Sequence, residues 1–108
     1  MSRYGLASAP RARRQIHVID DWWRQHRPAA PDLFASELET ALQRLCRVPA
    51  IGTHPIGERP STRKLLLPRC RYHIYYDIDE PKLEVQVVAV WHKIEHRSIR
   101  IVSVAVLP

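Results

Sequence analysis

The sequence predicts an α+β domain whose elements follow the order β-α-α-β-β-β, with the two helices forming a hairpin. Two segments in the first half carry apolar residues at helical spacing, and three segments after residue 61 have the apolar pattern of strands. The prolines fall at the boundaries of these segments rather than within them. A chain of 108 residues also fits a single domain.

The first half predicts one short strand and two helices. Residues 3–9 form the strand candidate, and Pro10 then suits the first turn of a helix. Two prolines near residue 30 end that helix, and a second begins near Asp32. The short break between them is typical of an αα-hairpin. The expected apolar stripes are Ala12, Ile16, Ile19 and Trp23 in the first helix, and Phe34, Leu38, Ala41, Leu42, Leu45 and Val48 in the second.

The second half predicts a loop and three strands. Residues 49–61 contain three prolines and two glycines, which indicates a loop. The strand candidates are residues 62–68, 71–79 and 83–92, with a proline turn between the last two. The last segment is apolar on both faces, so we expect it near the centre of the sheet. Its expected faces are Val85, Val87, Ala89 and Trp91 on one side and Val88 and Val90 on the other.

The C-terminal residues 98–108 are predicted to lie outside the main domain, which we place at residues 1–97. Both alternating sets of this tail are mainly apolar, so it is a candidate for an extra edge strand or for pairing with a second chain.

Charge suggests an acidic partner. The chain has a net charge of +6, and between Glu58 and Asp77 there is no acidic residue. No apolar run is long enough for a membrane helix or a signal peptide, so a cytoplasmic location is expected. Cys46 and Cys70 lack metal-ligand spacing, which predicts two reduced thiols and no metal.

The stretch "RCRYHIYYDID" has two distinct faces. Tyr72, Ile74, Tyr76 and Ile78 predict a buried face, and Arg71, His73, Tyr75 and Asp77 predict an exposed one. Guanidinium, imidazole and phenol groups bind phosphates or transfer protons. The exposed face is therefore a candidate functional surface.

Four segments in this order resemble the RelE/ParE superfamily of toxins from bacterial type II toxin–antitoxin systems. They are "ARRQIHVIDDWWRQHRPAAPDLF", "ALQRLCRVPAIG", "TRKLLLPRCRYHIYYDID" and "VVAVWHKIEHR", and the match spans about residues 4–97. The resemblance implies a small twisted antiparallel sheet packed on the helical hairpin, with no cofactor. It also implies a cognate antitoxin, a small acidic protein with a DNA-binding N-terminus, which wraps the toxin in a hetero-oligomeric complex.

The resemblance leaves two activities open. RelE-like members cleave messenger RNA on the ribosome without metal, which requires a base, an acid and cations near the scissile phosphate. ParE-like members inhibit DNA gyrase. Candidate residues for a ribonuclease are Arg63, Arg71, His73, Tyr75 and His92. Candidates for binding a partner or target are Arg59, Arg63, Lys64, Arg69, Arg71, His92 and Arg97.

The stretch "IDDWWRQHRPAAPDLF" and the residues after His92 favour the ParE-like branch. Lys93 and Ile94 stand where ribonuclease members often carry an aromatic residue. We therefore expect an inhibitor of DNA gyrase or of an unidentified target. A ribosome-dependent ribonuclease is the alternative, and a degenerate, non-toxic member is the third. His92 has either a structural role at the end of its strand or a catalytic or target-binding role. Trp22 and Trp23 are expected to pack in the core and the helical hairpin, with stacking on a nucleic acid as the alternative.

Overall fold

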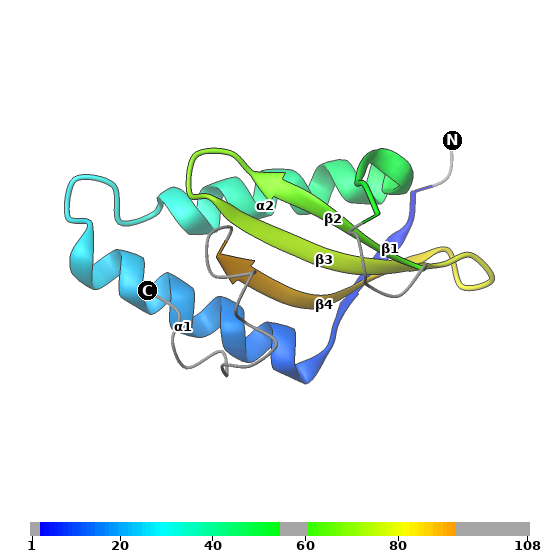
Figure 1. Ribbon diagram of the computed structural model, residues 1–108, viewed down its shortest axis with the longest axis horizontal. Helices are drawn as coiled ribbons and strands as arrows, with labels where there is room; N and C mark the ends of the chain where they lie inside the picture. The colour runs from blue at the N-terminus through cyan, green and yellow to red at the C-terminus, as the bar shows by residue number, and fades with distance from the viewer. Residues whose placement is uncertain (1–2, 55–60, 93–108) are drawn as a thin grey trace.

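The computed structural model describes residues 3–54 and 61–92 and has the predicted order of elements (Figure 1). Strand β1 (Gly5–Ser8) is followed by helices α1 (Pro10–His26) and α2 (Leu33–Arg47) and a 3₁₀ turn, η1 (Pro49–Ile51). Strands β2 (Thr62–Leu67), β3 (Tyr72–Asp79) and β4 (Glu84–His92) complete the fold. The α+β class, the helical hairpin and the central position of β4 are confirmed.

The sheet is mixed rather than wholly antiparallel. Its strand order is β1-β4-β3-β2, and β1 runs parallel to β4 while the other two pairs are antiparallel. The antiparallel pairs are joined by short turns. The connection from β1 to its parallel partner β4 is long, because it includes both helices as well as β2 and β3. A long connection of this kind permits a parallel pair.

A register shift in β4 changes which side chains face the helices. Tyr75 pairs with Ala89 and Tyr76 with Val87, so Val88 is an extra residue in β4. Cross-strand neighbours share a face of the sheet. The β4 residues on the same face as the core side of β3 are therefore Val85, Val87, Val90 and His92. The expected grouping of Val85 and Val87 with Ala89 and Trp91 is wrong, because strict alternation takes no account of a bulge.

The core lies between one face of the sheet and both helices. Ile19 of α1, Phe34 and Leu45 of α2, and Ile74 and Tyr76 of β3 are completely buried. Burial of such side chains supplies most of the driving force for folding. The expected stripes hold with a few corrections. Val48 is 53% exposed because it follows the last turn of α2, and Ile16 is only partly buried.

Gln15 is a buried polar residue that the apolar stripe does not predict. Its side chain is 1% exposed, and its Oε1 accepts a hydrogen bond from the backbone N–H of Val90 at 2.7 Å. β1 ends at Ser8, opposite Val87, so among the strands that the structure describes none lies beside the later part of β4 on that side. Gln15 of α1 therefore satisfies a backbone donor where β1 has ended.

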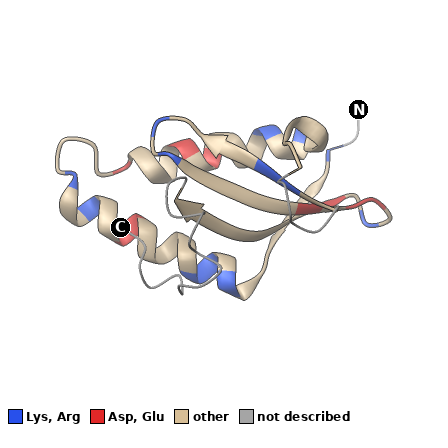
Figure 2. Ribbon diagram, viewed as in Figure 1, with Lys and Arg blue, Asp and Glu red and all other residues tan. Residues whose placement is uncertain are grey.

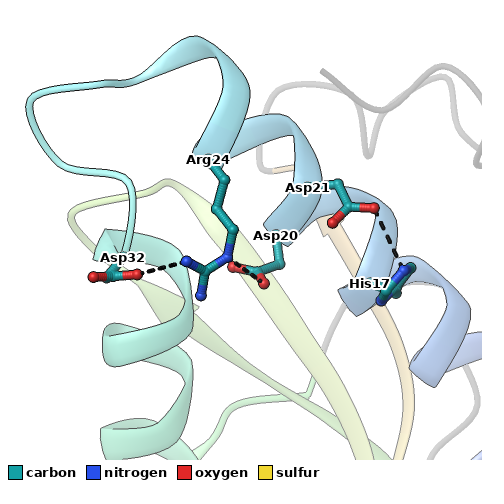
Figure 3. A network of polar contacts seen from close by, with 5 residues as sticks. All are labelled: His17, Asp20, Asp21, Arg24 and Asp32. Carbon is teal, nitrogen blue, oxygen red and sulfur yellow. Dashed lines mark hydrogen bonds and ion pairs between the residues drawn. The ribbon is translucent and has the colours of Figure 1, made fainter.

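The loop between the helices is held by Arg24 (Figure 3). Its guanidinium contacts Asp20 at 3.0 Å and Asp32 at 2.9 Å, and so joins α1 to the residue that precedes α2. The two carboxylates raise the pKa of Arg24.

Neither helix of the described residues has the length and apolar character that a membrane span requires.

Candidate functional site

A small pocket lies where the β2–β3 turn meets the end of β4 and the C-terminal half of α1. Its volume is about 230 Å³. We call it the basic pocket, and it is lined by Trp22, Trp23, Arg27, Arg69, Cys70, Arg71, Tyr72 and His92. Three guanidinium groups and one imidazole thus meet two indole rings, and none of the lining residues is acidic.

The β2–β3 turn brings Arg69 and Arg71 to this pocket. Arg71 has a φ of 71°, a left-handed conformation that residues other than glycine rarely adopt. Its backbone N–H donates to the carbonyl of Leu67 at 2.8 Å. Arg71 therefore lies in the turn before β3, and the expectation that it shares a strand face with His73 is wrong. It is exposed, as expected.

Glu37 of α2 fixes the same turn. Its carboxylate accepts hydrogen bonds from the backbone N–H groups of Arg69 and Cys70, both at 2.9 Å. The Cys70 thiol also donates to Glu37, with an Sγ–Oε1 distance of 2.8 Å. Burial, and then the hydrogen bond and charge of Glu37, raise the pKa of the thiol. Cys70 is therefore a protonated structural thiol at neutral pH.

His92 reaches the basic pocket because of the bulge in β4. It is paired with Tyr72, and the two rings meet edge to face with centroids 5.1 Å apart. Without the extra residue at Val88, His92 would point to the opposite face of the sheet. The bulge thus places the imidazole in the same pocket as Arg71.

Arg27 completes the pocket from the end of α1. Its guanidinium lies over the rings of Trp22 and Trp23, at 5.2 and 5.6 Å from their centroids. Such cation–π contacts restrict a long side chain that would otherwise be mobile. The predicted packing role of the two indoles is confirmed for Trp23, which is in the core, and Trp22 packs partly against it.

The other candidate residues lie elsewhere. Arg63 is on β2, and its Nη1 donates to the backbone carbonyl of Gly52 at 2.8 Å and to that of Ala50 at 3.3 Å. The face of the sheet that points away from the helices carries Lys64, His73 and Tyr75. Tyr75 is only 3% exposed there. The expected exposure of Tyr75 is therefore wrong. Its ring packs beside Trp91, with centroids 5.2 Å apart. Arg59 and Arg97 lie outside the described residues.

The candidate ribonuclease residues are thus divided among three places. Arg71 and His92 line the basic pocket, Arg63 holds the loop after α2, and His73 and Tyr75 lie on the other face. Sequence reasoning missed Arg27 and Glu37. Arg27 directly follows the last residue of α1, and its spacing of four residues from Trp23 was a usable signal. Glu37 gave none, because its contacts lie more than 30 residues away.

A second, larger hollow runs between the helices beside β1. Its volume is about 550 Å³, and we call it the apolar groove. Its apolar lining comprises Leu6, Ile16, Phe34, Ala35, Leu38, Leu42 and Cys46. Its polar lining comprises Arg3, Arg13, His17, Asp20, Glu39 and Gln43. Leu6 is 44% exposed, a large value for a leucine in a strand.

The described residues contain no group of three or more His, Cys, Asp or Glu side chains placed to hold a metal ion.

Comparison with known proteins identifies the family. Residues 7–96 match the family described as "ParE toxin of type II toxin-antitoxin system, parDE". No curated protein matches the sequence. Similar solved structures include the chromosomal ParDE toxin–antitoxin system from P. aeruginosa, with a TM-score of 0.68 and 18% identity over 83% of this chain and 96% of that one.

Two RelBE structures are also similar. The RelBE2 toxin–antitoxin complex from Mycobacterium tuberculosis gives a TM-score of 0.61 and 26% identity, covering 85% of this chain and 93% of that one. The intact E. coli RelBE complex gives a TM-score of 0.58 and 21% identity, covering 82% of this chain and 95% of that one. The shared fold and the match over residues 7–96 support the same conclusion: the chain belongs to the ParE toxin family, within the RelE/ParE superfamily.

Proposed function

We propose that this protein is the toxin of a type II toxin–antitoxin system and that an antitoxin segment fills its apolar groove. The family match and the solved toxin–antitoxin complexes of similar fold support a toxin with such a partner. The groove is the observation that carries the partner assignment. An open hollow of about 550 Å³ lined by Ile16, Leu38 and Leu42 suits a segment with apolar anchors.

The charges around the groove suggest what else the segment carries. Arg3, Arg13 and His17 line the groove from the N-terminus and α1, and the whole chain has a net charge of +6. Asp20 and Glu39 also line the groove, but Asp20 is paired with Arg24. His17 lies 3.4 Å from Asp21, so the cationic character of the groove comes mainly from Arg3 and Arg13. An antitoxin segment with Asp or Glu beside its apolar anchors would therefore match this surface.

The antitoxin proposal is tested by co-expression with the product of the neighbouring reading frame. Leu42→Glu places a charge in the groove and is expected to abolish co-purification. Val18→Glu is the matched control, because Val18 is 49% exposed on α1 and does not line the groove. Equal capture by both variants, with both folded by circular dichroism, would contradict the groove assignment.

For the target, we favour inhibition by binding, with DNA gyrase or an unidentified protein as the candidate. The ParE family match supports this choice. The dispersal of the ribonuclease candidates also supports it, because Arg63 is engaged with two backbone carbonyls and Tyr75 is buried on the other face. A toxin of this kind needs a recognition surface and no set of proton-transfer groups.

The alternative is a ribosome-dependent ribonuclease. One observation favours it: Arg71 and His92 line the same pocket, so a cation and a proton-transferring group lie close together. A third alternative is a degenerate member that binds its antitoxin without being toxic.

One set of assays separates the three. Purified protein is added to a gyrase supercoiling assay and to ribosomes translating a defined message, and growth is followed after expression without antitoxin. Loss of supercoiling with intact message supports the gyrase inhibitor. Cleavage in the ribosomal A site that disappears in His92→Ala and Arg71→Ala supports the ribonuclease. Growth arrest with neither effect indicates another target, and normal growth indicates the degenerate member.

A further inference from the structure

We propose that the basic pocket is a binding site for a phosphate group. The pocket is distinct from the apolar groove, and the two hollows have no lining residue in common. The proposal goes beyond the proposed function, since it concerns direct binding by the isolated protein and holds whichever target is correct.

The guanidinium groups of the pocket are not paired with an acidic side chain within residues 3–54 and 61–92, where the nearby carboxylate of Glu37 is bonded to the backbone of Arg69 and Cys70 instead. Arg27, Arg69 and Arg71 form no ion pair with any carboxylate of the described residues. Arg24, one turn before Arg27, shows the contrast, because it contacts two aspartates. In Figure 2 the acidic residues of the sheet gather at the β3–β4 turn, at the opposite end of the sheet from the basic β2–β3 turn. Such a site has a strong preference for an anion.

The cationic groups are also held in place before a ligand arrives. Arg27 lies over two indole rings, which limits its motion. Glu37 accepts hydrogen bonds from the backbone of the β2–β3 turn, and Arg71 keeps a left-handed conformation there. A non-glycine residue in that conformation indicates strain that often accompanies a functional site. Preorganisation of this kind lowers the entropy lost on binding.

The size of the pocket and its number of guanidinium groups favour a phosphate over a carboxylate ligand. A volume of about 230 Å³ is below the usual range of about 300–1,000 Å³ for sites that enclose a whole small molecule. Each guanidinium presents five N–H donors, so three of them exceed what the two oxygens of one carboxylate can accept. A phosphate has more oxygens and up to two negative charges, and it pairs with arginine in a bidentate manner.

Stacking of a base on Trp22 contributes little in this arrangement. His26 stacks against the Trp22 ring, with centroids 4.7 Å apart, and Arg27 also lies over that ring. The recognised chemistry is therefore the phosphate itself, carried as free phosphate, by a mononucleotide, or by the backbone of a nucleic acid.

The test is a titration of the purified protein, followed by calorimetry and tryptophan fluorescence, at fixed ionic strength. Inorganic phosphate is expected to bind saturably, and acetate at the same concentration is expected not to. Arg27→Gln should weaken phosphate binding at least tenfold. Arg14→Gln is the matched control, since Arg14 is exposed on the same helix outside the pocket, and it should change the affinity less than twofold.

Arg71→Gly provides a second variant that separates binding from folding. Glycine adopts a positive φ without strain, so this change should not lower the melting temperature. It should nevertheless weaken phosphate binding at least tenfold. Unchanged affinity in both Arg27→Gln and Arg71→Gly, equal binding of acetate, or no saturable binding of phosphate would overturn the proposal.

The source of the phosphate is decided by two further ligands. Adenosine monophosphate and a short single-stranded oligonucleotide are titrated against the same variants. Tighter binding of the oligonucleotide than of phosphate, with the same loss in Arg27→Gln, indicates a nucleic-acid backbone. Equal affinity for phosphate and the mononucleotide, without a gain for the oligonucleotide, indicates a site for free or terminal phosphate.

Discussion

The carboxylate of Glu37 and the thiol of Cys70 are 2.8 Å apart, measured from Oε1 to Sγ, although they are 33 residues apart in the chain. The same carboxylate accepts the backbone N–H groups of Arg69 and Cys70. One residue of α2 therefore fixes the turn that carries two arginines of the basic pocket. The stability of the helix-to-turn contact and the geometry of the pocket are linked through this side chain.

Removing the Glu37 carboxylate is expected to destabilise the protein. Glu37→Ala leaves two backbone donors and the thiol without their acceptor, and hydrogen bonds to a charged group are each worth about 1.5–3 kcal/mol. Because the site is only partly buried, water can replace some of these hydrogen bonds. We therefore expect the free energy of unfolding to decrease by about 1.5 kcal/mol. Urea denaturation measures it. Glu39→Gln, exposed on the same helix, is the control, and an equal effect there would contradict the assigned role.

The Cys70 thiol should make stability decrease at alkaline pH. Burial and Glu37 raise its pKa in the folded protein, whereas an unfolded cysteine has a pKa of about 8.5. Above that pH the unfolded chain loses a proton that the folded chain retains, so the free energy of unfolding decreases as pH rises. The slope from this group is at most about 1.4 kcal/mol per pH unit. Comparing wild type with Cys70→Ala by urea denaturation between pH 8 and 9.5 isolates it, and identical slopes would count against the prediction.

Tyr76 is expected to stabilise the loop after α2 through its hydroxyl. The Oη donates to the carbonyl of Pro49 at 2.6 Å and accepts the N–H of Gly52 at 2.9 Å, and the residue is fully buried. Tyr76→Phe leaves both groups without this partner, at a cost of about 1–3 kcal/mol. The control is Tyr4→Phe, which removes a hydroxyl that donates to Glu80 at the surface, so its effect on stability should be much smaller. Thermal unfolding of the two variants should differ accordingly.

Arg63 and Lys64 should respond differently to the same neutral substitution. Arg63→Gln removes the donor to the carbonyls of Gly52 and Ala50, and should destabilise by about 1–2 kcal/mol. Lys64→Gln lies on the opposite face of β2 and should change stability by about 0.5 kcal/mol or less. If Arg63 acts mainly in binding, the urea midpoints of the two variants will coincide.

Association with the antitoxin should be slowed by salt. Opposite charges around a binding surface accelerate encounter more than they slow dissociation, and salt screens them over about 10 Å at 0.1 M. Raising the salt concentration should therefore reduce the association rate constant, with a smaller effect on dissociation. Stopped-flow fluorescence measures both rates. An association rate that does not change with salt would be inconsistent with an acidic antitoxin segment.

Much of the fold follows from local patterns. The apolar spacing of α1 and α2, Pro10 at the start of α1, and the alternation in β3 are each contained in a few consecutive residues. These patterns predict the α+β class and the order of the elements. The parallel pairing of β1 with β4 joins residues about 80 positions apart, and no local pattern specifies it.

The candidate site was less accessible to sequence reasoning. Alternation placed Arg71, His73 and Tyr75 on one exposed face, whereas Arg71 lies in a left-handed turn and Tyr75 is buried. A single extra residue at Val88 reverses the face of every later position in β4, including His92. Bulges and turns of this kind depend on the partner strand, so they are invisible in the strand's own sequence.

The sequence by itself determined the elements, most of the core residues and the family, because helical and strand periodicity and the order of motifs are properties of neighbouring residues. Only the tertiary structure decided which charged groups meet. It brought Arg27, Arg71 and His92 into one pocket, assigned Arg63 to a backbone contact, and joined Glu37 to Cys70. The physical reason is that hydrogen bonds and charges act over a few ångströms, and those distances are set by packing between segments that are far apart in the chain.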